Sequence, residues 1–116
     1  MFCLTIFDDH YKKIKNLGYI PVGLGKNISN KNFLTDKSKN NISDKNPFYG
    51  EYTFHYNLWK NNIDRTENNW IGFCQYRKFW CLKSFNAGET ESIEDLSKNI
   101  LKKIPEEFKD FDTILG

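Results

Sequence analysis

The sequence predicts an α/β fold with a mainly parallel sheet and flanking helices. Three short apolar runs, at residues 1–7, 19–22 and 70–73, have the length and composition of strands. Segments with helical spacing of apolar or aromatic residues lie between and after these runs. Alternation of strands and helices is typical of layered folds with a parallel sheet. With 116 residues, of which 39% are hydrophobic, the chain has the size and apolar content of one domain, residues 1–116.

The first strand is predicted from the apolar run at residues 1–7, which stops at Asp8 and Asp9. The run is too short for a signal peptide or a membrane span, and it suits a buried strand. Residues 8–17 are predicted to hold a helix that stops at Gly18, because glycine adopts the backbone conformation that ends many helices.

The second predicted strand, residues 19–22, leads into Gly23 and Gly25. Glycines at a strand end permit close approaches that a side chain would block. The segment that follows, residues 26–44, is polar and rich in asparagine, and we expect it to be irregular. Long segments of this kind in compact domains are often functional.

A long helix is predicted to run from Asn46, as N-cap, and Pro47, as first helical residue, to about residue 62. Its aromatic residues fall on two neighbouring stripes, which predicts burial on two sides. The stripes are Phe48, Tyr52, His55 and Trp59, and Tyr49, Thr53, Tyr56 and Lys60. The third strand, residues 70–73, is almost continuously apolar, so we expect it at the centre of the sheet.

The last third of the chain predicts a loop, an amphipathic helix and the start of a fourth strand. Residues 84–90 form the loop, and Ser92 begins a relative of the capping box that opens the helix. Its apolar face extends to Ile104, before Pro105. Residues 111–115 suit a strand, and no closing helix follows them, so we expect the sheet to be incomplete in this chain.

Charge and cysteine content narrow the class of protein. The net charge of +2 comes from 17 basic and 15 acidic residues that are mixed along the chain, and nucleic-acid binding would need a concentrated basic face. The three cysteines, Cys3, Cys74 and Cys81, lack the spacing of metal ligands. Two of them lie in apolar surroundings, where free thiols pack as small hydrophobes, so we expect a protein of the reducing cytoplasm.

The strongest candidate for anion binding is the pair Arg77 and Lys78, which directly follows the third predicted strand. A guanidinium fork can hold a diphosphate through two parallel hydrogen bonds, and a lysine adds a point charge. The alternative is a surface salt bridge, or a cation stacked on Tyr76 or Phe79.

Glu51 and His55 are one helical turn apart, so a carboxylate there can orient an imidazole for acid–base work. The alternative is a structural hydrogen bond between the helix and a neighbouring loop. Among the tryptophans, Trp80 is the best candidate for a sugar platform, because it borders the basic cluster.

The segment before the long helix offers a second anion site, because exposed N–H groups at a helix start favour negative charge. Its residues are Asn41, Ser43 and Lys45, with Tyr49 placed to stack on a base or sugar. The alternative is that Asn41 and Ser43 hold the turn through hydrogen bonds to the backbone.

Two strand ends complete the predicted nucleotide edge. Asp8 and Asp9 follow the first strand, and Gly23 and Gly25 follow the second, where a nucleotide can lie against the backbone. The segment 110–112 has the Asp-x-Asp spelling of a metal motif, but it precedes its apolar run. We therefore predict a helix-to-strand loop there and assign no metal ligand.

Three stretches of this sequence form a recognisable set of motifs. The first is the helix start Asn-Ile-Ser-x-Lys-Asn-x-x-Tyr-x-Glu with the helix end Trp-Lys-Asn, at residues 41–61; the second is Gly-x-x-x-Tyr-Arg-Lys-Phe-Trp, at residues 72–80; and the third is residues 19–25. Together these motifs resemble domain-of-unknown-function family 4422. Members often carry histidine where this chain has Gln75. The resemblance covers roughly residues 19–82.

The resemblance implies a GT-A-like, Rossmann-like glycosyltransferase of capsular-polysaccharide or lipopolysaccharide synthesis. It implies a nucleotide-sugar donor, a divalent metal (Mn²⁺ or Mg²⁺), and a glycan or lipid-linked acceptor, with no nucleic acid. It leaves room for peripheral association with a membrane. The family is about twice as long, so we expect this chain to be its amino-terminal, nucleotide-sugar-binding portion. A noncatalytic carbohydrate-binding or interaction domain is the alternative.

Overall fold

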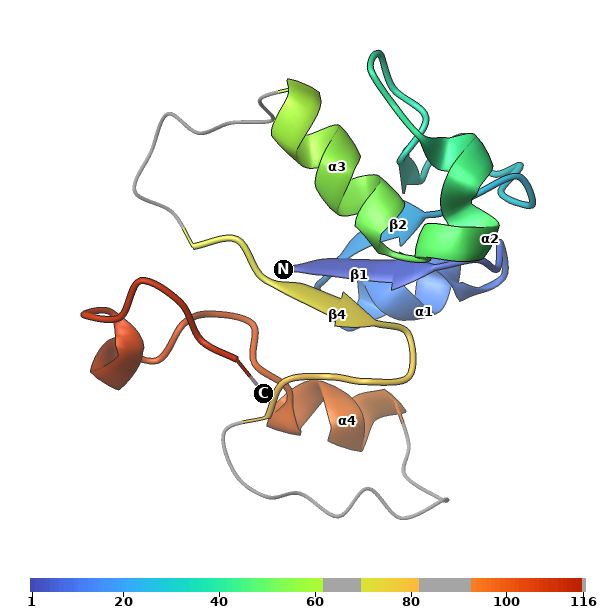
Figure 1. Ribbon diagram of the computed structural model, residues 1–116. Helices are drawn as coiled ribbons and strands as arrows, with labels where there is room; N and C mark the ends of the chain where they lie inside the picture. Colours follow the sequence, from blue (N-terminus) through green and yellow to red (C-terminus); the bar gives the residue numbers. More distant parts are fainter. Residues whose placement is uncertain (62–69, 82–92, 116) are drawn as a thin grey trace.

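The computed structural model describes residues 1–61, 70–81 and 93–115, and its centre is a four-stranded parallel sheet (Figure 1). The strands are β1 (Phe2–Thr5), β2 (Ile20–Gly23), β3 (Leu34–Thr35) and β4 (Phe73–Gln75). Their spatial order is β3-β2-β1-β4, and every neighbouring pair is parallel. The α/β prediction is therefore confirmed, and this order is compatible with a Rossmann-like arrangement.

Two strands differ from the prediction. The strand predicted at residues 70–73 is β4, which begins only at Phe73. It was expected at the centre of the sheet, and it lies at an edge of the described sheet. The central position is taken by β1, which pairs with β2 on one side and β4 on the other. β3 lies within the segment expected to be irregular. With only two residues, β3 is too short to show any periodicity in the sequence.

Helices cover both faces of the sheet (Figure 1). Helix α1 (His10–Asn16) lies on one face, and α2 (Asn46–Tyr49) and α3 (Tyr52–Asn61) lie on the other. Gly18, with a φ of 83°, follows α1 as predicted.

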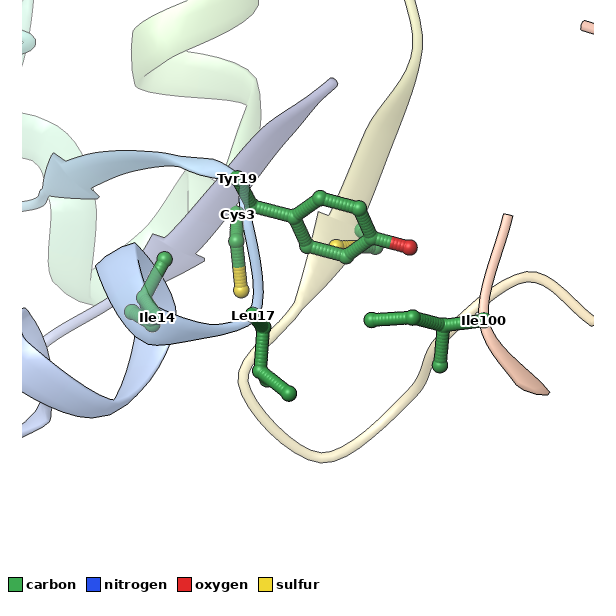
Figure 2. Close-up of a cluster of buried hydrophobic side chains, with 6 residues drawn as sticks. Cys3, Ile14, Leu17, Tyr19 and Ile100 are labelled. Atoms are coloured by element: carbon green, nitrogen blue, oxygen red, sulfur yellow. The ribbon is translucent and has the colours of Figure 1, made fainter. Parts of the chain in front are cut away.

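The core on the α1 face joins both ends of the described chain (Figure 2). Its buried members are Cys3, Ile14, Leu17, Tyr19, Cys74 and Ile100. The Tyr19 hydroxyl donates a 2.6 Å hydrogen bond to the carbonyl of Leu101. This bond fastens the segment after α4 (Ile93–Asn99) to the sheet. Cys3 and Cys74 are buried free thiols in register on adjacent strands, which confirms their packing as small hydrophobes.

The core on the α3 face centres on Phe54, which is fully buried against Leu4, Val22 and Leu24. Burying a phenylalanine side chain contributes about 1.5–3 kcal/mol, so this contact anchors α3 to the sheet. The position of α3 sets the position of the polar side chains on its first turn.

The predicted long helix is interrupted at Gly50, whose φ of 54° breaks the helical backbone between α2 and α3. Asn46 is the first residue of α2 and not an N-cap. Its side-chain amide instead donates to the carbonyl of Gly50 and to the hydroxyl of Thr53, and so holds the junction between the two helices.

Burial on two sides of this helix was also a wrong prediction. The buried face of α3 carries Thr53, Phe54 and Asn57. Phe48 is 87% exposed and Trp59 is 55% exposed, so the aromatic members of the first stripe face outward except for the half-buried His55. Aromatic spacing alone did not reveal which side met the sheet, because polar residues with internal hydrogen bonds occupy most of the buried face.

The carboxyl-terminal predictions have mixed outcomes. α4 ends at Asn99, before the predicted Ile104, and residues 84–90 and Ser92 lie outside the described residues. The predicted strand at residues 111–115 is wrong: this segment pairs with no strand of the described residues, and it exposes Phe111 and Leu115. The segment 110–112 is an exposed loop, as predicted. Within the described residues, no helix is long and apolar enough to cross a membrane.

Candidate functional site

The carboxyl edge of the sheet is the natural place for a site. All four strands are parallel, so they end at the same edge. From β1 the chain builds β2 and β3 on one side, and β4 is then added on the other side of β1. In open α/β sheets, ligands bind in the crevice where the strand order reverses. Here that point lies between the ends of β1 and β4.

An aromatic cluster follows β1 at this point. The ring centroid of Phe7 lies 5.1 Å from that of His10 and 5.6 Å from that of Tyr76. The centroids of His10 and Tyr76 are 4.6 Å apart. The imidazole Nδ1 is 2.9 Å from the hydroxyl of Thr5, so the end of β1 holds it in place. Phe7 is 44% exposed. Sequence reasoning missed Phe7 and His10, and the available signal was an aromatic residue directly after a buried strand.

The basic turn follows β4 at the same point. The N–H of Tyr76 donates to the carbonyl of Leu4 at 3.1 Å, which ties the turn to β1. The N–H of Lys78 donates to the carbonyl of Gln75 at 3.0 Å and closes the turn. The Arg77 guanidinium lies 5.1 Å from the centroid of the Tyr76 ring, as in the stacking alternative. Arg77 and Lys78 are exposed, and no carboxylate of the described residues forms a salt bridge with either.

A cavity of about 460 Å³ lies beside the basic turn. Its described lining is Leu4, Glu51, His55, Phe73, Cys74, Gln75, Lys78, Phe79, Trp80 and Cys81. The cavity therefore brings both predicted acid–base residues to the basic turn. The Gln75 amide donates a 2.8 Å hydrogen bond to Oε1 of Glu51, and no hydrogen bond joins the side chains of Glu51 and His55. Glu51 therefore has a structural hydrogen bond, as in the alternative, but its partner belongs to strand β4 and not to a neighbouring loop.

The imidazole of His55 is held between aromatic rings. Its centroid lies 4.3 Å from that of Phe73 and 5.6 Å from that of Tyr52. Nε2 is buried and has no hydrogen-bond partner among the described residues. Burial lowers the pKa of His55, and the negative charge of Glu51 partly opposes that shift. The neutral imidazole is therefore the form favoured at neutral pH, and its nitrogen lone pair is available to accept a proton.

Other residues that were predicted for the site at the strand ends form packing contacts or hydrogen bonds with neighbouring residues of the chain. A Cβ on Gly23 would lie 2.7 Å from the Ile28 side chain, so Gly23 is required by packing. The Asp8 carboxylate accepts hydrogen bonds from Ser29 and Asn30, chiefly the Ser29 hydroxyl, and these bonds lower its pKa. Asp9 is exposed, 4.0 Å from Nε2 of His10.

The polar groups of the segment before α2 also form hydrogen bonds with one another. The Asn41 amide donates to the carbonyls of Lys37 and Lys39, at 3.0 and 2.9 Å, and its oxygen accepts from the N–H and hydroxyl of Ser43. These are the turn-holding bonds named as the alternative. Lys45 and Tyr49 are exposed. The structure thus gives Asn41 and Ser43 a structural role and leaves Lys45 and Tyr49 without one.

A buried carboxyl group, Asp36, was missed by sequence reasoning. Its oxygens accept from the hydroxyl of Thr53 at 2.6 Å and from the N–H of Gly25 at 3.4 and 3.5 Å. Gly25 itself has a φ of 67°. Asp36 follows β3, so the only signal was a carboxylate after a strand too short to predict.

The described residues contain no group of three or more histidine, cysteine, aspartate or glutamate side chains placed to hold a metal ion. Comparisons with curated proteins and with solved structures find no match. A family model does match, over residues 3–116 and therefore over nearly the whole sequence. The chain belongs to the family described as domain of unknown function (DUF4422).

Proposed function

We propose that this chain is the nucleotide-sugar-binding part of a GT-A-like glycosyltransferase that acts in the synthesis of surface polysaccharide. The resemblance of its motifs to glycosyltransferase-like proteins suggests the reaction. The observation that carries the proposal is the position of Arg77 and Lys78: two exposed cations, without a carboxylate partner in the described residues, stand where the strand order reverses.

Each part of this edge suits one part of a nucleotide sugar. Phe7 and Tyr76 offer aromatic surface for the base. Arg77 is a guanidinium fork that suits the diphosphate, and Lys78 adds a second positive charge. The donor would thus extend along the ends of β1 and β4 toward the cavity that contains Glu51 and His55.

His55 is the proposed general base, because its neutral imidazole is favoured by burial. In the transfer, the imidazole turns to bring its buried Nε2 to the cavity, and Nε2 takes the proton of the acceptor hydroxyl. The hydroxyl oxygen forms a bond to the anomeric carbon, and the nucleoside diphosphate leaves with the electron pair of the bond that breaks. Glu51 lies one turn away, and its negative charge stabilises the imidazolium that forms.

A divalent metal remains part of the proposal through the family resemblance alone. Such an ion neutralises the developing charge on a diphosphate. Because the described residues do not form a protein-held metal site, we assign it no protein ligand and route no step through it.

Calorimetric titration with UDP, GDP, CMP and their sugar conjugates, with and without Mn²⁺, tests this proposal. We expect saturable binding of one nucleotide and a loss of about tenfold or more in Arg77→Ala, because a charge-assisted bidentate contact is removed. Arg77→Lys keeps the charge and loses the guanidinium fork, so its nucleotide affinity should lie between those of the wild type and Arg77→Ala. Lys12→Ala, which removes an exposed cation on α1, is the matched control. No nucleotide binding by a folded protein would overturn the proposal.

A second candidate function, a noncatalytic carbohydrate-binding or interaction domain, is favoured by the aromatic residues that α2 and α3 expose. Phe48, Tyr52 and Trp59 each leave half or more of their surface uncovered. Exposed aromatic side chains of this size are typical of interaction surfaces. The same titration separates the two functions, because the second predicts no nucleotide binding and no effect of Arg77→Ala.

A further inference from the structure

The cavity beside β4 has the size and lining of a site for a small polar ligand. Its volume of about 460 Å³ lies within the range of small-molecule sites. β4 is the edge strand of the described sheet, and the chain after it turns back along that edge (Figure 1). The cavity therefore lies against an edge that no further described strand covers.

One wall of the cavity is aromatic and held in place. The indole N–H of Trp80 donates to the carbonyl of Phe73 at 2.7 Å. Since its one polar group is satisfied, Trp80 contributes apolar surface to the lining, next to Phe79. The C–H groups on one face of a pyranose ring pack well on such surfaces.

The polar residues of the lining retain hydrogen-bonding capacity. The bond from Gln75 to Glu51 uses one amide hydrogen and one carboxylate oxygen, and leaves the amide oxygen, a second N–H and the second carboxylate oxygen. Lys78 adds further donors. Glu51 and Lys78 carry opposite formal charges, so the lining favours a neutral ligand with several hydroxyl groups over an ion.

His55 supplies an independent indication. A buried nitrogen without a partner costs about 1–3 kcal/mol, and a ligand hydroxyl recovers that cost once the His55 ring turns to bring Nε2 into the cavity. Gln75, Glu51 and Lys78 are ordinary surface-compatible residues. A half-buried imidazole whose Nε2 is buried and unsatisfied is not, and functional sites are where such groups persist.

We propose that this cavity binds one neutral pyranose unit, with Trp80 and Phe79 as its apolar wall and Gln75, Glu51 and His55 as partners of its hydroxyl groups. The inference rests on the proposed function only in identifying that unit as the acceptor sugar. Binding of the free sugar needs no nucleotide and no diphosphate contact, so it is testable by itself.

Ligand-observed NMR with methyl glycosides of glucose, galactose, mannose and N-acetylglucosamine, without nucleotide, measures this binding. We expect millimolar affinity for at least one of them, weakened about tenfold in Gln75→Ala and in His55→Phe. His55→Phe is the sharper variant. It keeps the ring and removes the unsatisfied nitrogen, so thermal stability should be unchanged or higher while sugar binding falls.

Lys12→Ala, which removes an exposed cation on α1 that is not part of the cavity lining, is the matched control and should leave free-sugar binding unchanged. Sugar binding without nucleotide binding would overturn the proposed function and support this inference. Nucleotide binding with no sugar bound by the folded protein would overturn this inference alone. Sugar binding that neither Gln75→Ala nor His55→Phe weakens would also overturn it, because the sugar would then lie elsewhere.

Discussion

The carboxyl edge of the sheet has two parts that differ in how completely their polar groups are satisfied. The closed part follows β2 and β3 and contains Gly23, Gly25 and Asp36. The open part follows β4 and contains Gln75, Arg77 and Lys78, with the neighbouring cavity. Both parts carry residue types that binding sites use, so the residue types alone do not distinguish them.

In the closed part, each of these groups meets another group of the chain. Asp36 is buried and accepts from Thr53 and Gly25, and the Ile28 side chain fills the space beside Gly23. In the open part, His55 has an unpartnered nitrogen and the basic turn has no described carboxylate partner. A group whose bonding capacity is used internally serves the fold, and one whose capacity is unused is available to a ligand.

The largest effect on stability is expected from Asp36→Ala in the closed part. The change leaves the hydroxyl of Thr53 and the N–H of Gly25 without their buried acceptor. Loss of such bonds should lower the free energy of unfolding by about 3 kcal/mol, measured by urea denaturation. Asp9→Ala, at an exposed carboxylate on the same edge, should change it by less than about 0.5 kcal/mol. Equal effects of the two changes would mean that the hydrogen bonds of Asp36 do not stabilise the closed part.

The next largest effect is expected from Gly25→Ala. Alanine is strained at a φ of 67°. Its Cβ would also lie 2.8 Å from Oδ1 of Asn46, the residue that holds the α2–α3 junction. We expect a loss of about 2 kcal/mol by urea denaturation.

Gly18→Ala is the control for the glycine at position 25. It has a similar positive φ of 83°, but its Cβ would meet only the flexible side chain of Lys102, at 3.7 Å. It should cost about 1 kcal/mol, the backbone contribution alone. If the two variants were equally stable, the contact with Asn46 would not require glycine at position 25.

The sequence predicted the fold better than the site because the two depend on different distances along the chain. The apolar runs and Gly18 are local signals, and they placed β1, α1 and β2 within a few residues. Gly50 is also local, yet a single glycine inside a helical pattern did not reveal that the helix would break there.

The site depends on contacts between distant residues. Glu51 and Gln75 are 24 positions apart, and Tyr19 contacts Leu101 across 82 positions. Sequence spacing predicted that Glu51 and His55 would lie together, which they do at the cavity. It did not predict that Gln75 would donate a hydrogen bond to the Glu51 carboxylate, since strand register decides which β4 residue faces α3.

The smallest expected effect is a pH dependence from the open part. Burial lowers the pKa of His55 in the folded protein below its ordinary value of 6.5. Between those two pKa values the unfolded chain binds more protons, so stability rises with pH in that window and is lost as the pH falls below about 6.5. His55→Phe removes this contribution. We therefore expect urea midpoints that fall less steeply as the pH drops below about 6.5 in His55→Phe than in the wild type.

Glu51→Gln sharpens the same measurement. The carboxylate charge raises the pKa of His55, so its removal should lower that pKa further and extend the pH-dependent window to more acid values. NMR titration of the His55 ring protons measures the pKa directly in both proteins. A wild-type pKa at or above 6.5 would mean that the folded protein accommodates the imidazolium. The Nε2–H group of that imidazolium would then have a hydrogen-bond acceptor. The cavity would in that case belong with the closed part of the edge.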